Sequence, residues 1–170
     1  AVHFTNPILN TKYIQLLHLL DQRLVMNGKM FDNGKLKRMC EYLPGMNLSG
    51  NFFLSTNDAG PRIPANAQFL GFTAKLVNSS TILALAQRQQ RTSPAASKVT
   101  ELDGALVTLF TQIPEKKLST ALPAVNHWYN MGICILREKP ESPEKGTVVS
   151  LKGGHNAESH NHLDLGHFTL

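Results

Sequence analysis

The pattern of apolar residues changes once along the chain, near residues 119–124, and this change limits the folds that the sequence can adopt. Before it, apolar residues recur at helical spacing, as at Ile14, Leu17, Leu20 and Leu24. After it, short runs of β-branched and aromatic residues dominate. Helices that precede strands, rather than alternate with them, predict an α+β fold or two domains. We therefore expect a helical part over residues 1–120 and a β part over residues 121–170.

The helical part divides at its glycine, asparagine and proline residues. The spacing predicts helices over 10–28, 34–45 and 96–113, and two more within 64–91 that are separated near Asn78 and Ser79. Pro44 is expected to stop the second helix, and Pro64 suits a first helical turn. The stretch "GMNLSGNFFLSTNDAGPRIP" (45–64) is predicted to be long and irregular.

The β part is predicted to contain three strands, over 126–138, 147–154 and 160–170, with the polar connection "KPESPEKG" after the first. Three strands leave an edge and a face to be covered. We therefore expect the chain to be a piece of a longer protein, in which the β domain continues.

Composition narrows the classes of protein. An apolar fraction of 42% and a charged fraction of 17% predict a packed core rather than a disordered chain. The net charge of +5 favours an acidic partner, but the basic residues form no stripe with aromatic residues, so nucleic acid is not expected. No apolar run is long enough to span a membrane. Cys40 and Cys134 lack zinc-ribbon spacing and are typical of buried apolar fillers, although a disulfide stays open.

Four of the seven histidines lie in the stretch "GGHNAESHNHLDLGH" (153–167). On a strand, His160, His162 and Asp164 would share one face, while Leu163 and Leu165 would face a core. Two imidazoles beside a carboxylate can bind zinc, or the carboxylate can orient an imidazole. The alternative without a function is a histidine-rich surface loop that binds no metal or ligand.

Two known motifs with similar letters fit this stretch less well. The metallo-β-lactamase motif H-x-H-x-D-H would need a histidine where the chain has Leu165, and it needs further ligands downstream. The HNH nuclease motif is not a contiguous triplet. An unrelated zinc-dependent hydrolase that uses His160, His162 and Asp164 nevertheless stays an alternative.

The segments "HWYNMGICILRE" and "VVSLKGGHNAESHNHLDLGHFTL" closely resemble the heparinase II/III-like polysaccharide lyases. The shared pattern is a strand pair, a Gly-Gly turn, S-H-x-H-x-D, and then a glycine and a phenylalanine. It falls on Gly153, Gly154, Ser159, His160, His162, Asp164, Gly166 and Phe168. The resemblance is strong over 128–170 and diffuse before that, where "STNDAGPRIP" is similar to a loop between helices of the family.

The resemblance implies a partial (α/α) toroid over 1–120, followed by the first strands of an antiparallel β-sandwich over 121–170. It implies β-elimination of an acidic, uronic-acid-containing polysaccharide, in the bacterial periplasm or outside the cell. His160 would be catalytic and contact the substrate, and His162 would bind zinc. Ser159 and Asp164 would be supporting residues. Tyr13 is a weaker match to the family's catalytic tyrosine.

The resemblance matches neither the family's other zinc ligands nor the Asn or His that neutralises the carboxylate of the uronate to a position of this chain. The fragment alone is therefore expected to be inactive and to have an incomplete zinc site. A non-catalytic carbohydrate-binding or structural relative is the other alternative to a lyase. His127 and Tyr129 are predicted to pack rather than to catalyse. Nothing in the sequence predicts the oligomeric state or names the polymer.

Overall fold

The computed structural model describes residues 16–24, 29, 31, 34–55, 60–62, 66–92, 112–114, 121–142, 144–155, 157 and 165–170. The chain divides into two compact units. The first comprises Ala1–Pro44 and Pro64–Leu118, and its described regular elements are helices. The second comprises Gly45–Ile63 and Ser119–Leu170, and it contains the described strands. The predicted mixed α+β composition is therefore confirmed.

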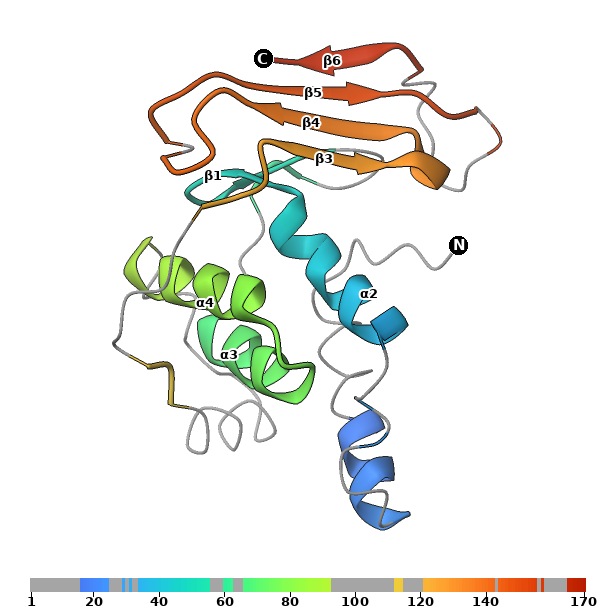
Figure 1. Cartoon of the computed structure of the whole chain (residues 1–170), viewed down its shortest axis with the longest axis vertical. Coiled ribbons are helices and arrows are strands. Elements are labelled where there is room, and N and C mark those ends of the chain that lie inside the picture. The colour runs from blue at the N-terminus through green and yellow to red at the C-terminus, as the bar shows by residue number, and fades with distance from the viewer. Residues whose placement is uncertain are drawn as a thin grey trace. The chain divides into compact units, whose positions relative to one another are not determined.

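Four described helical segments support the predicted spacing. Residues 16–23 are helical, within the predicted helix 10–28. Helix α2 spans Gly34–Gly45, helix α3 spans Ala67–Leu76 and helix α4 spans Ser80–Thr92 (Figure 1). Asn66 caps α3, because its side-chain oxygen accepts a hydrogen bond of 2.9 Å from the Phe69 amide. His18 packs edge-on against the ring of Phe72, with 5.4 Å between the ring centroids.

The predicted break between two helices is confirmed at Asn78 and Ser79. Asn78 has φ 50, a left-handed conformation that asparagine tolerates better than most residues. Ser79 caps α4, which begins at Ser80, since the Ser79 hydroxyl accepts a hydrogen bond of 3.3 Å from the Ile82 amide. Helices α3 and α4 run side by side (Figure 1), and both contribute buried apolar residues, among them Leu70, Ala74, Ile82 and Leu85.

The helix predicted over 34–45 is confirmed as α2, which ends one residue after Pro44, because a proline in the last turn removes only one backbone donor. Residues 112–114, at the end of the predicted helix 96–113, are not helical, and the rest of that helix lies outside the described residues.

The second unit contains an antiparallel sheet with the strand order β3-β4-β5-β6 (Figure 1). The strands span Val125–Trp128, Ile133–Arg137, Val148–Lys152 and His167–Thr169. Each strand pairs with the next along the chain, so the sheet is a meander. Three register rows cross all four strands, and the middle one runs from His127 through Cys134 and Leu151 to Phe168.

The predicted strand 126–138 is wrong as a single strand, because it is a hairpin. β3 ends at Trp128, the 3₁₀ turn η2 covers Tyr129–Met131, and Gly132 follows in a left-handed conformation with φ 59. The strand predicted over 147–154 is present as β5. Of the strand predicted over 160–170, the structure describes β6 from His167, preceded by a turn at Leu165 and Gly166. Leu165, expected on a core face, is exposed.

The stretch 45–64 is also not irregular throughout. β1 (Asn47–Ser49) and β2 (Phe52–Phe53) form a small hairpin around Gly50, which has φ 50. The side-chain amide of the buried Asn47 donates hydrogen bonds to the carbonyl oxygens of Gly50 and Phe52, each at 3.0 Å, and these bonds stabilise the turn. This segment belongs to the sheet unit, a membership that the sequence did not predict.

The inner face of the four-stranded sheet carries the core of the second unit. Ile133 and Ile135 are fully buried there, and Trp128 packs against Gly45, where an added Cβ would lie 2.5 Å from the indole. Ser150 and Lys152 from β5 are also buried on this face. The inner face is therefore partly polar.

Candidate functional site: the connection between β5 and β6

The residues predicted to form a site lie outside the described residues. These are Tyr13, Ser159, His160, His162 and Asp164. The structure therefore does not test whether they come together, and the catalytic and zinc-binding roles stay predictions. What it does describe is the frame on both sides of the S-H-x-H-x-D stretch, which lies in the chain between β5 and β6.

The two ends of this connection are held beside each other. Lys152, the last residue of β5, is the register partner of His167, the first residue of β6. The Gly166 amide donates a hydrogen bond of 2.9 Å to the Lys152 carbonyl oxygen. Because both ends are part of one ladder, the connection leaves and returns at the same end of the sheet.

The start of the connection contacts the turn between β3 and β4. The Gly153 amide donates to the Gly132 carbonyl oxygen, with 2.5 Å between nitrogen and oxygen. Gly132 was not predicted to matter. Its signal in the sequence was a glycine between two strand-like runs, "NHWYNM" and "ICILRE", which is typical of a hairpin turn.

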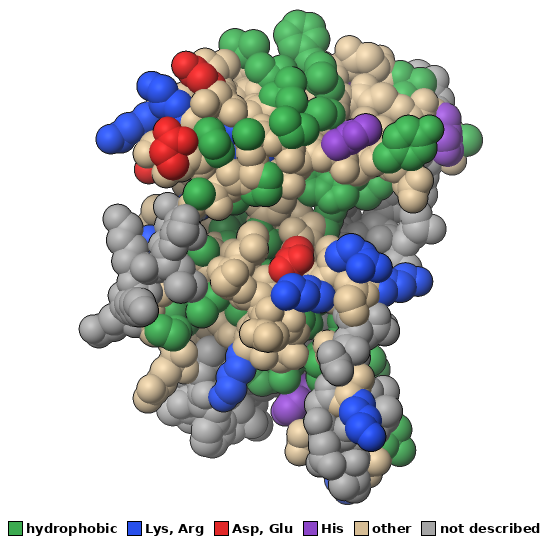
Figure 2. Space-filling view, in the orientation of Figure 1, with side chains coloured by type: hydrophobic (Ala, Val, Ile, Leu, Met, Phe, Trp, Pro, Cys, Tyr) green, Lys and Arg blue, Asp and Glu red, His purple; other side chains and the backbone are tan. Residues whose placement is uncertain are grey.

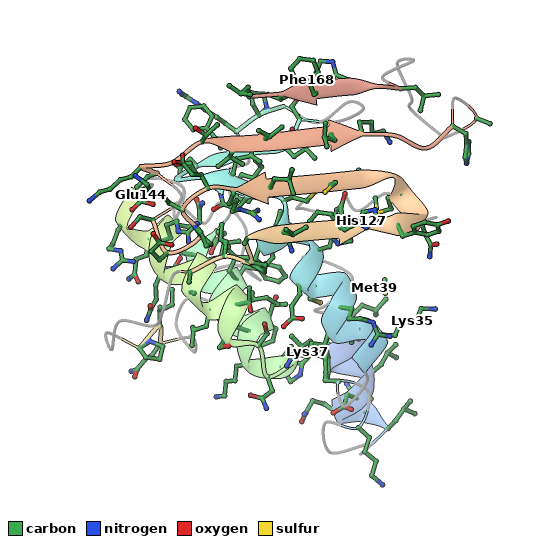
Figure 3. All side chains as sticks on the ribbon, turned by 45° about the horizontal axis from the view of Figure 1, so that its top comes forward. Lys35, Lys37, Met39, His127, Glu144 and Phe168 are labelled. Atoms are coloured by element: carbon green, nitrogen blue, oxygen red, sulfur yellow. The ribbon has the colours of Figure 1, made fainter. Side chains whose placement is uncertain are left out.

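The described histidines of the sheet unit do not form a metal site among themselves. His155 and His167 are exposed near the two ends of the connection, and the His167 Nε2 lies 3.3 Å from the Thr169 hydroxyl oxygen. His127 is exposed on β3 (Figure 3). Within the part of the chain that the structure describes, no group of three or more metal-ligating side chains occurs.

His127 and Tyr129, predicted to pack rather than to catalyse, pack against each other as an exposed ring pair. Their rings meet edge to face, with 6.0 Å between the centroids and an interplanar angle of 79°. Tyr129 is 81% exposed. The reason is the end of β3 at Trp128, since the turn that follows carries Tyr129 away from the sheet, while the half-buried Trp128 packs beside Gly45.

The outer face of the sheet is more apolar than its inner face. Register places Val125, His127, Cys134, Leu136, Val149, Leu151 and Phe168 on it. Phe168 is 63% exposed, and Val125, Leu136 and Leu151 are exposed as well. Figure 2 shows hydrophobic side chains gathered over the sheet, and Figure 3 shows His127 and Phe168 on its two edge strands. A solvent-facing side of an antiparallel sheet is usually polar, so this outer face is unusual.

Among the residues that the structure describes, two ionisable side chains have shifted pKa values, and both lie away from the connection. Burial, and secondarily the charge of Glu41, raises the pKa of the Cys40 thiol to about 11. The Thr147 amide, which donates to the Glu138 carboxylate at 2.9 Å, is the main cause that lowers the pKa of Glu138. These groups therefore belong to helix packing and to the β4–β5 connection, respectively.

Comparison with protein-family models and with curated proteins gives no match for this chain. The resemblance to heparinase II/III-like lyases thus depends on the residues of the β5–β6 region and the strands before it. None of the described helices has the length and apolar content needed to cross a membrane.

Proposed function

We propose that the chain is part of a polysaccharide lyase that cleaves a uronic-acid-containing polysaccharide by β-elimination. One observation carries the proposal: the S-H-x-H-x-D stretch, with Gly153 and Gly154 before it and Gly166 and Phe168 after it, lies between two neighbouring strands. The whole order of strand, Gly-Gly, histidine motif, glycine and phenylalanine matches the family pattern. The location outside the cytoplasm is part of the same proposal.

The anchored ends of the connection support a catalytic role for it. Catalytic groups must be held close to their productive geometry, and rigid strands do this better than free loops. The Lys152–His167 pairing and the Gly166–Lys152 hydrogen bond fix both ends on one ladder. The residues between them therefore start and end at defined positions.

The reaction requires three chemical roles to be filled by groups of the protein. A base removes the proton at C5 of the uronate, a donor neutralises the carboxylate as negative charge develops, and an acid protonates the leaving oxygen at C4. We assign His160 to contact with the uronate, as a donor to its carboxylate or a partner in proton transfer. Tyr13 is the candidate acid and base. A tyrosine, whose ordinary pKa is about 10, needs neighbouring positive charge for this task.

Zinc is proposed as a structural ion held by His162. A structural zinc site takes about four ligands, and the resemblance supplies one imidazole from this chain, with Ser159 and Asp164 as supporting residues only. The donor set is thus incomplete. We propose that these 170 residues alone hold zinc weakly, whereas a longer protein that supplies the other ligands holds it tightly.

The outer face supports the proposed β-sandwich. In a sandwich, both faces that meet are apolar, and the sheets pack about 10 Å apart. The row His127–Cys134–Leu151–Phe168 and its neighbours Val125, Leu136 and Val149 have the composition of such a face. We propose that a second sheet covers it, and that the helices of the first unit are part of an (α/α) toroid.

A non-catalytic carbohydrate-binding protein is the second candidate, and the exposed ring pair of His127 and Tyr129 favours it. Exposed aromatic rings offer an apolar surface with a polar tip, which suits a sugar face. This candidate keeps affinity for an acidic polysaccharide without any cleavage.

One screen separates the two candidates. The protein as it is encoded, with any residues that precede or follow these 170, is incubated with a panel of acidic polysaccharides. Lyase action creates a carbon–carbon double bond in the product, so ultraviolet absorbance rises. We expect this rise for at least one uronate polymer. Binding to a polymer without any absorbance change would support the non-catalytic candidate and reject the lyase.

A further inference from the structure

The turn between β3 and β4 touches the start of the β5–β6 connection backbone to backbone. The Gly153 amide donates to the Gly132 carbonyl oxygen at 2.5 Å. A Cβ added to Gly132 would lie 2.4 Å from the Gly154 nitrogen and 2.5 Å from the Gly153 carbonyl carbon. Non-bonded atoms do not approach so closely, and the obstacle is backbone rather than a flexible side chain. Only glycine therefore allows this contact.

We propose that Gly132 is a positioning residue for the β5–β6 connection: its missing side chain lets the turn and the connection touch, and this contact sets the direction in which the chain leaves β5. The effect on catalysis rests on the proposed function. The effect on the direction of the chain does not.

Conformational freedom alone does not explain the glycine at this position. Gly50 has φ 50, close to the φ of 59 at Gly132, but a Cβ at Gly50 would meet nothing within 4 Å. An alanine at either position suffers a similar penalty for the left-handed conformation. Only at Gly132 does it also collide with another segment, so Gly50→Ala separates the two causes.

The contact is also asymmetric. A Cβ added to Gly153 would lie 3.5 Å from the Gly132 carbonyl oxygen, an ordinary contact distance. The same hydrogen bond therefore tolerates a methyl group on one partner and not on the other. At the other end, the Gly166–Lys152 hydrogen bond of 2.9 Å holds the return of the chain to β6.

The test compares Gly132→Ala with Gly153→Ala and Gly50→Ala by nuclear magnetic resonance of the labelled 170-residue chain. We expect Gly132→Ala to shift the amide signals of Gly153, Gly154 and Gly166 and the ring signals of His155. Gly153→Ala should shift only its direct neighbours, and Gly50→Ala should leave all these signals in place. Equal signal shifts in Gly132→Ala and Gly153→Ala, or no shifts in Gly132→Ala, would overturn the proposal.

If Gly132→Ala does not fold, hydrogen exchange of the unaltered chain tests the proposed contact between Gly132 and Gly153. The proposal requires the Gly153 amide to be protected like the amides of the β4–β5 ladder, because its hydrogen bond is part of a rigid contact. Exchange of that amide at the rate of an exposed loop would overturn the proposal.

The catalytic consequence is measured in the encoded protein. A misplacement of about 1 Å can cost about 100-fold in rate. We therefore expect Gly132→Ala to lower kcat by about 100-fold with an unchanged zinc content, and Gly50→Ala, in the β1–β2 hairpin, to stay near the parent. Normal kcat in Gly132→Ala would remove the catalytic part of the proposal. A parent that cleaves no polymer would reject the lyase function instead, and the magnetic resonance and exchange results would still decide the positioning role.

Discussion

The guanidinium group of Arg137 donates a hydrogen bond to the carbonyl oxygen of Asn47, with 2.9 Å between Nη2 and the oxygen. The same nitrogen donates to the Gly45 carbonyl oxygen at 2.8 Å. Nη1 donates to the Pro123 carbonyl oxygen at 2.9 Å and to the Asn126 Oδ1 at 2.6 Å. Arg137 is only 5% exposed. One buried side chain thus ties β4 to the start of β1 and the residue two before it, and also to β3 and the segment that leads into it.

Replacing Arg137 should therefore destabilise the sheet unit strongly. Arg137→Met keeps much of the volume but removes the donor from four acceptors, and we expect a loss of about 3 kcal/mol in the free energy of unfolding. Urea unfolding followed by the fluorescence of Trp128, the single tryptophan, measures it. Arg62→Met is the control, because its exposed guanidinium only covers the Phe52 ring at 4.8 Å and should cost less than ~1 kcal/mol. Equal losses in both variants would contradict this role.

Arg137 also illustrates the limit of sequence reasoning. Its position in "ICILR", two residues after Ile135, places it on the buried face of β4, and that much follows from alternation. Its acceptors at Gly45 and Asn47 lie far away in the chain, in a stretch that reads as irregular because it is rich in glycine and asparagine. Side-chain bonds such as those of Asn47 make a hairpin there, and local propensity does not report them.

The sequence predicted a structural feature correctly where neighbouring residues alone determine it. The break between α3 and α4 was predicted at Asn78 and Ser79, and the cause is the left-handed conformation of Asn78 and the cap at Ser79. The turn at Gly132 was missed, because the apolar residues on both sides of it form one continuous strand-like run. The predicted catalytic and zinc-binding residues lie outside the described residues, so their roles remain predictions.

Ser79 should contribute to the stability of the helical unit in two ways. Its hydroxyl caps α4 and also donates a hydrogen bond of 2.7 Å to the Glu41 Oε1 of α2. Ser79→Ala removes both interactions, and we expect a loss of about 1–2 kcal/mol. Thermal unfolding followed by far-ultraviolet circular dichroism measures the loss. Ser80→Ala, at an exposed neighbouring position, is the control and should be nearly neutral; a loss at Ser80 as large as at Ser79 would rule out the cap.

Cys40 should make stability depend on pH in the alkaline range. Burial and Glu41 raise the pKa of its thiol from 9.0 to about 11, so the unfolded chain loses this proton first as pH rises. The free energy of unfolding should therefore fall between pH 9 and pH 11, because the Cys40 thiol is deprotonated in the unfolded chain before it is in the folded one. Urea midpoints across this range should fall less steeply in Cys40→Ala than in the parent. Cys134→Ala is the control and should keep the steeper fall, whereas parallel curves for all three proteins would refute the prediction.

The outer face should respond differently in the short chain and in a longer protein that supplies a second sheet. Leu151 is 42% exposed here, so Leu151→Lys in the 170-residue chain should change stability by less than about 0.5 kcal/mol. In a protein where a second sheet covers the face, the buried ammonium should cost several kcal/mol. Chemical unfolding of both forms measures the difference. Ile135→Ala on the inner face is the control, with a loss of about 3 kcal/mol in both forms. A neutral Leu151→Lys in the longer protein would contradict the sandwich.

The most direct test of the proposed lyase is the initial rate of ultraviolet absorbance increase in the encoded protein with His160→Ala and His162→Ala. His160→Ala should reduce the rate by about 10²–10⁴-fold, because it removes a group that contacts the uronate, while zinc content and melting temperature stay those of the parent. His162→Ala should lose zinc and melt at a lower temperature, and its activity should fall with the fold. A His160→Ala protein that cleaves the polymer at nearly the parental rate would contradict the account.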